Sequence, residues 1–149
     1  MFMKPDFRFT LEPDWRVAPL AFWVHVPVAG SRTDYEPPAP TAIQHRGFPV
    51  LHVNVAGVDL WFSSRAQLDH FIEVMETKPR PTSRQLSERR GSTVGPNAHW
   101  LSRLPATLKS PGEQARLVGT LKSVRERLLP YGDAWYRASE AMARGGRLV

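Results

Sequence analysis

The sequence contains no cysteine. This absence excludes a disulfide framework, a thiolate zinc site, an iron–sulfur cluster and a catalytic cysteine. Long apolar runs are absent as well, because no stretch approaches the roughly 18 apolar residues that a membrane span needs. The opening residues, MFMKPD, also lack the apolar segment of an export signal. We therefore expect a cytoplasmic protein without a membrane partner.

The common motifs of catalysis and cofactor binding are also missing. The chain has no glycine-rich phosphate loop, no dinucleotide fingerprint, no zinc-protease helix and no nucleophile elbow. We therefore predict no cofactor, no metal ligand and no catalytic residue. The protein is expected to bind a partner rather than to catalyse a reaction.

What the chain does have is the composition of a globular protein. Of its 149 residues, 42% are hydrophobic and 23% are charged, and a chain of this length can bury its own core. We predict one domain over residues 1–149. The net charge of +6 is unevenly distributed, because residues 1–76 carry more acidic than basic side chains and residues 77–149 carry 14 basic against 5 acidic ones. An acidic partner is therefore expected at the second half.

A β-hairpin over residues 50–62 is the strongest local prediction. Apolar residues alternate with polar ones on both sides of Ala56 and Gly57, and a two-residue loop with glycine favours a tight primed turn. Such a turn places every apolar pair on one face, whereas a slip of one residue destroys the match. The predicted pairs are Val55 with Val58, Asn54 with Asp59, Val53 with Leu60, His52 with Trp61, and Leu51 with Phe62.

An amphipathic helix is predicted directly after the hairpin, over residues 64–77. Ser64 and Gln67 have the spacing of a capping box at its start. The apolar positions that follow have helical spacing, so one stripe of the helix can cover the apolar face of the hairpin. These positions are Leu68, Phe71, Ile72 and Met75.

The alternating pattern of residues 20–28 predicts a third strand, which Pro27 ends or confines to a sheet edge. The proline-rich residues 29–48 are predicted to form a long loop, which is unusual in a compact domain. The fold class is therefore α+β: a small antiparallel sheet of about three strands with one packed helix in residues 1–78, followed by a basic helical half in residues 79–149.

Four helices are predicted in that second half. Two short ones are expected near residues 83–90 and 98–104, and a longer one of about 18 residues begins at Ser110. The long helix has an apolar stripe of Leu117, Leu121, Val124 and Leu128. In the last helix, Trp135, Ala138, Ser139 and Met142 share a face.

The second face of the predicted sheet is a candidate interaction face. It would display Trp23, His25, His52, Asn54, Asp59 and Trp61. Aromatic side chains on a sheet can stack on the bases of single-stranded nucleic acid. The alternative is that helices cover the two tryptophans as a second core layer. A further alternative is a small hydrolase in which His25, His52 and Asp59 supply acid–base chemistry.

The basic side chains of the second half are the main binding candidates, because phosphate recognition needs positive charge along a surface rather than a fixed motif. We expect a non-enzymatic protein that contacts nucleic acid or a nucleoprotein assembly here. Alternatively, the protein is an interaction module, an inhibitor or an adaptor, that uses the Trp/His sheet face or the loop 29–48. The candidate basic residues are Arg80, Arg84, Arg89, Arg90, Arg103, Lys109, Arg116, Lys122, Arg125 and Arg127.

Overall fold

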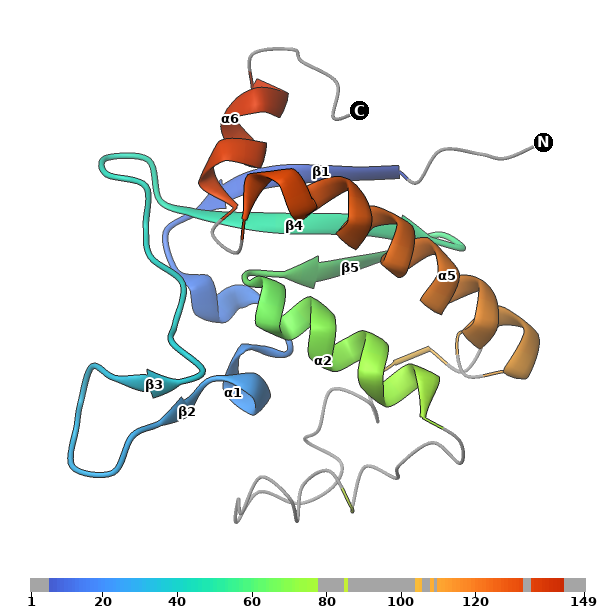
Figure 1. The fold of residues 1–149 in the computed structure, drawn as a ribbon, viewed down its shortest axis with the longest axis horizontal. Helices are drawn as coiled ribbons and strands as arrows, with labels where there is room; N and C mark the ends of the chain where they lie inside the picture. The colour runs from blue at the N-terminus through green and yellow to red at the C-terminus, as the bar shows by residue number, and fades with distance from the viewer. Residues whose placement is uncertain are drawn as a thin grey trace.

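The computed structural model describes residues 6–77, 85, 104–105, 108, 110–132 and 135–143. It contains a three-stranded antiparallel sheet with the strand order β1–β4–β5 (Figure 1). These strands are β1 (Asp6–Glu12), β4 (Phe48–Val55) and β5 (Val58–Phe62). A second, two-stranded sheet joins β2 (Val26–Pro27) to β3 (Tyr35–Glu36).

The described helices include α1 (Ala21–Val24), α2 (Arg65–Glu76), α5 (Pro111–Leu128) and α6 (Tyr136–Ala143). Short 3-10 turns form η1 (Trp15–Val17) and η4 (Leu129–Tyr131). The predicted α+β fold class is therefore confirmed. The predicted short helices near 83–90 and 98–104 fall almost entirely outside the described residues.

The hairpin forms as predicted, with the same five residue pairs between β4 and β5. Both turn residues have a positive φ, 52° at Ala56 and 82° at Gly57, as a type I′ turn requires. The alternating pattern and the turn chemistry therefore specify one register, and the structure adopts it.

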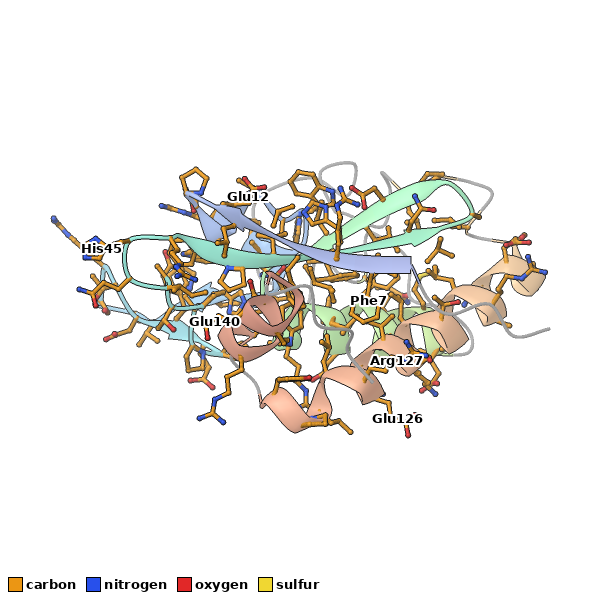
Figure 2. All side chains as sticks on the ribbon, turned by 90° about the horizontal axis from the view of Figure 1, so that it is seen from above. Phe7, Glu12, His45, Glu126, Arg127 and Glu140 are labelled. Atoms are coloured by element: carbon orange, nitrogen blue, oxygen red, sulfur yellow. The ribbon has the colours of Figure 1, made fainter. Side chains whose placement is uncertain are left out.

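The apolar face of this hairpin lies under two helices. α2 and α5 pack against each other and against the same side of the sheet, while α6 lies by β1 (Figures 1 and 2). Burying one such apolar side chain stabilises the fold by about 1.5–3 kcal/mol. The core includes Leu51, Val53 and Phe62 of the sheet, Leu68, Phe71 and Met75 of α2, and Leu117, Leu121, Val124 and Leu128 of α5.

The start of α2 largely follows the predicted capping box. Ser64 is the N-cap residue, and its hydroxyl accepts a hydrogen bond from the Gln67 amide at 3.2 Å. The Gln67 side chain turns back to the Ser63 amide, at 3.0 Å, rather than to the amide of Ser64 itself. Gln67 is fully buried, so these bonds satisfy polar groups that water cannot reach.

The prediction of a continuous strand over residues 20–28 in the hairpin's sheet is wrong, because only Val26–Pro27 form a strand and it pairs with β3. Residues 21–24 form one helical turn, in which the Val24 amide donates to the Leu20 carbonyl at 3.0 Å. Alternation would bury Phe22 and Val28, yet their side chains are 51% and 41% exposed. The burial of Leu20 and Val24, four positions apart, has helical spacing instead.

The third strand of the main sheet is β1, near the N-terminus. It pairs with β4 from Asp6 opposite Asn54 to Glu12 opposite Phe48. Phe7 and Phe9 alternate with Arg8 and pack against the core. The region 29–48 is also not a loop throughout, because it includes β3 and an isolated bridge between Ile43 and Gly47.

The predicted long helix that begins at Ser110 and the predicted last helix correspond to α5 and α6. All four residues of the predicted α5 stripe are buried. Trp135, Ala138 and Ser139 are also buried, as the prediction for the last helix requires. The side chain of Met142 is outside the described part of the chain.

Candidate functional site

The proline-rich segment after β3 is held to the rest of the protein by an aromatic cluster. The Trp15 ring lies edge-on to both His25 and Tyr35, with centroid separations of 5.2 and 5.3 Å. Trp15 belongs to η1, His25 ends α1, and Tyr35 begins β3. Three separate segments therefore fix where the chain enters the proline-rich region.

His25 links this segment to the start of α2. Its Nδ1 lies 3.0 Å from the Pro37 carbonyl oxygen, and its Nε2 lies 2.8 Å from the Ser64 hydroxyl. A carbonyl oxygen can only accept, so Nδ1 carries the proton. In the neutral ring Nε2 is then an acceptor, and the Ser64 hydroxyl donates to it.

The electrostatic environment of His25 favours this neutral ring. The side chain is 1% exposed, and burial lowers its pKa below the ordinary value, although the hydrogen bond to the Pro37 carbonyl opposes the shift in part. Burial has this effect because a charged imidazolium loses its hydration. At neutral pH the His25 ring is therefore neutral, and its Nε2 accepts a hydrogen bond from the Ser64 hydroxyl.

A pocket of about 750 Å³ lies beside this hydrogen-bonded pair. Its walls combine residues 37–43, Pro49, the first turn of α2 and Trp135. Ser64 contributes to the lining, whereas His25 lies behind it. The volume falls within the range of small-ligand and peptide pockets.

The pocket walls are mainly apolar, and several of their residues have no amide donor. Four lining residues are prolines, at positions 37, 38, 40 and 49, and a proline offers a carbonyl acceptor but no amide donor. Trp135 is 4% exposed, and its indole nitrogen has no hydrogen-bond partner among the described residues. The walls are therefore mainly apolar, and the proline wall carries hydrogen-bond acceptors.

Charged side chains at this pocket pair with one another. Asp69 lies 3.7 Å from Arg65 of the same helix and 3.0 Å from Arg125 of α5. Arg65 and Asp69 line the pocket. The charges of Arg65 and Asp69 cancel within the pocket lining, and the pair of Asp69 with Arg125 ties α2 to α5.

A second polar cluster lies on the sheet face opposite α2 and α5. His52 Nδ1 is 3.1 Å from Asp59 Oδ2, and His52 Nε2 is 2.6 Å from the Thr10 hydroxyl. The same Asp59 oxygen accepts from the Trp61 indole at 2.8 Å. Figure 2 shows Glu12 on this side of the sheet and Phe7 on the helical side.

Asp59 is the charged centre of this cluster. Partial burial raises its pKa, but hydrogen bonds from His52 and Trp61, with the charges of His52 and Arg8, outweigh that effect and lower it. The carboxylate is therefore ionised at neutral pH. Neither of the two pockets formed by residues 37–43 with the start of α2 and by the end of α2 with α5 includes this cluster.

Four of the six residues predicted to share the Trp/His face lie on one face of the sheet, and their role as an interaction face stays a prediction. His52, Asn54, Asp59 and Trp61 share one face of the sheet, as their register requires. The placement of Trp23 and His25 there is wrong, because both belong to the α1 turn and are buried. The predicted trio of His25, His52 and Asp59 is therefore divided, since His25 bonds Pro37 and Ser64 instead.

Three of the four basic candidates that the structure describes form ion pairs with acidic side chains of the chain. Lys122 pairs with Glu76 of α2, Arg125 pairs with Asp69, and Arg116 lies 3.7 Å from Glu113 of its own helix. Arg127 is half-buried. Nucleic-acid contact stays a prediction, because the remaining candidates lie outside the described residues: Arg80, Arg84, Arg89, Arg90, Arg103 and Lys109.

Two further searches within the described part of the chain gave negative results. No three potential metal-binding side chains among these residues lie together. No described helix is both long and apolar enough to cross a bilayer. Comparison with known proteins also gives no relative: no protein family, no curated protein and no solved structure matches the chain.

No pocket role for Ser64 or Trp135 is predicted from the sequence. Ser64 was identified only as a helix cap, and Trp135 only as part of an apolar helix face. The sequence does signal that Ser64 has a positioned hydroxyl, because a capping box fixes the serine rotamer. Its contact with His25 depends on a fold in which residues 39 positions apart meet, and no local pattern predicts that.

Proposed function

We propose that the protein is an interaction module that binds an extended apolar peptide segment of a partner protein in the pocket beside the proline-rich loop. The observation that carries this proposal is the composition of the pocket wall. Prolines 37, 38, 40 and 49 line the pocket and have apolar rings and no amide donors, and the Pro37 carbonyl already accepts a hydrogen bond from His25. An extended peptide supplies the complement, because its backbone amides donate and its apolar side chains cover the rings.

The anchoring of the loop supports the same proposal. The Trp15 contacts and the bond from His25 to the Pro37 carbonyl hold the pocket wall in place without a ligand. A wall that is already ordered loses little conformational entropy when a partner binds. Trp135 contributes an aromatic edge to the pocket lining, although most of its ring is buried within the fold.

The ion pairing on α2 and α5 favours a protein partner over a nucleic acid at this site. The two charged residues of the pocket lining, Arg65 and Asp69, have opposite charges, so the lining itself has no net charge. Phosphate binding needs positive charge and weakens steeply with salt. Binding of an apolar peptide is expected to persist at high salt.

A library of fluorescein-labelled peptides with apolar residues at alternating positions tests the proposal by fluorescence anisotropy. Ala42 lines the pocket and is exposed, so Ala42→Arg puts a long charged side chain at the site. This variant is expected to weaken binding at least about tenfold, or 1.4 kcal/mol. Thr33→Arg is the matched control, because Thr33 is exposed in the same region and outside the pocket lining.

Equal peptide affinity in the Ala42→Arg and Thr33→Arg variants would refute the pocket as the binding site. Absence of peptide binding, together with salt-sensitive binding of DNA or RNA, would favour the basic second half as the functional surface instead.

A further inference from the structure

The hydrogen bonds of Ser64 and His25 have the geometry of an activated nucleophile. Such a site needs a hydroxyl bonded to a general base, and a third group that orients the base. Here the hydroxyl oxygen and Nε2 are 2.8 Å apart, and the Pro37 carbonyl holds Nδ1 at 3.0 Å. All three residues come from different segments of the fold, and two of them, Ser64 and Pro37, line the pocket.

The Ser64 oxygen also keeps a lone pair with which it can attack a carbonyl carbon. The hydroxyl proton is donated to His25, and one lone pair accepts from the Gln67 amide at 3.2 Å. A hydroxyl oxygen has a second lone pair. The helix cap therefore fixes the hydroxyl without using all of its electron pairs.

We propose that Ser64 is a catalytic nucleophile, that His25 is its general base, and that the pocket cleaves carboxylic esters with an apolar acyl group. The Ser64 oxygen bonds to the carbonyl carbon while its proton passes to His25 Nε2. The tetrahedral adduct then expels the alcohol, which takes that proton, and an acyl ester remains on Ser64. Water attacks this ester by the same route and releases the carboxylic acid, which restores Ser64.

The first turn of α2 supplies the stabilisation of the oxyanion. Ala66 lies at the second helical position and lines the pocket, and amides at this position have no acceptor within their own helix. The helix N-terminus also carries partial positive charge. An oxyanion formed at Ser64 is therefore adjacent to backbone donors, which are the groups that stabilise acyl-transfer transition states.

The pocket walls define the substrate class. Proline rings and Trp135 surround the space next to Ser64, and apolar walls of this kind accept a hydrocarbon acyl chain rather than a charged one. This activity uses the pocket of the proposed peptide site, but it does not require that peptides bind. The two proposals therefore fail independently.

A fluorophosphonate reagent, which forms a stable phosphonyl ester with activated serines, tests the nucleophile directly. Mass spectrometry of the labelled protein is expected to place the adduct on Ser64. Ser64→Asn is expected to abolish labelling while retaining the fold, because asparagine is also a favoured N-cap residue. Ser123→Ala is the control serine variant and is expected to label as wild type does, because Ser123 lies on α5 outside the pocket lining.

Hydrolysis of p-nitrophenyl butyrate tests the complete reaction. The wild-type protein is expected to show a burst of p-nitrophenol from acylation of Ser64. His25→Gln is expected to slow acylation by roughly 10²–10⁴-fold, the usual contribution of a general base. Circular dichroism verifies that each variant is folded, and Ser64→Asn provides the decisive comparison if His25→Gln fails to fold.

Two results would overturn the inference. One is the absence of any adduct on Ser64 of the folded wild-type protein. The other is ester hydrolysis at an equal rate in wild-type and Ser64→Asn protein. Either result would leave the Ser64–His25 bond as a structural link between α1 and α2, and peptide binding would still be measured separately.

Discussion

Gly47 provides a sharp test of how β1 is placed against β4. Its φ is +110°, and a Cβ atom built there would lie 2.6 Å from the backbone carbonyl oxygen of Glu12. That oxygen belongs to a paired strand, so it cannot move aside as a flexible side chain would. Gly47→Ala therefore combines a conformational cost of roughly 1–2 kcal/mol with an overpacking cost of roughly 1–3 kcal/mol.

Two other glycines separate these contributions. Gly57 also has a positive φ, of +82°, but nothing lies within 4 Å of its added Cβ, so Gly57→Ala is expected to cost only the conformational term of about 1–2 kcal/mol. Gly119 is inside α5 and equally open, so Gly119→Ala is expected to stabilise the protein by about 0.5–1 kcal/mol.

Urea unfolding followed by circular dichroism measures all three free energies of unfolding, with the denaturant slope as a check on two-state behaviour. The expected order of stability is Gly119→Ala, then wild type, then Gly57→Ala, then Gly47→Ala. If Gly47→Ala were no less stable than Gly57→Ala, the close contact between β1 and the start of β4 would be refuted.

Three further predictions concern the turn, a buried histidine and an ion pair. Ala56→Asn is expected to raise the free energy of unfolding by about 1 kcal/mol in urea, because asparagine tolerates the positive φ; an unchanged midpoint would contradict the type I′ turn. Burial lowers the pKa of His25 below its ordinary 6.5. The unfolded chain then binds more protons, and stability falls as the pH drops from about 6.5 toward the folded pKa. His25→Gln is expected to reduce this fall, and an unaltered pH profile would contradict the buried neutral ring. A double-mutant cycle of Arg125→Ala and Asp69→Asn is expected to give a coupling of about 1 kcal/mol or less, which salt reduces; a salt-independent coupling would contradict a partly exposed pair.

The hairpin and α2 could be predicted in detail because their determinants are local. The register of β4 and β5 follows from the alternating apolar residues and the Ala56–Gly57 turn, and the start of α2 follows from Ser64 and Gln67. A shift of one residue would break the match in each of these patterns. The separate signals therefore agree on the same residues.

The third strand was assigned to the wrong segment because two segments have the same kind of pattern. Residues 7–11 alternate as clearly as residues 20–28 do, but only the former pair with β4. The third strand is the segment that reaches the open edge of the hairpin. An alternating pattern does not indicate which of the two segments reaches that edge. The candidate pocket could not be predicted for the same reason. Only in the folded chain does His25 reach Ser64, and only there do Ser64 and Trp135 line one pocket.

The pairing of β1 with β4 also has a consequence for the order of folding. Its partners are separated by 36 residues at Glu12–Phe48 and by 48 at Asp6–Asn54, whereas the β4–β5 hairpin closes through a two-residue turn. Chain closure over such a span is entropically costly and slow. During synthesis β1 emerges first, yet it has no pairing edge until the hairpin exists. Of the three strands of this sheet, β1 is therefore expected to dock last.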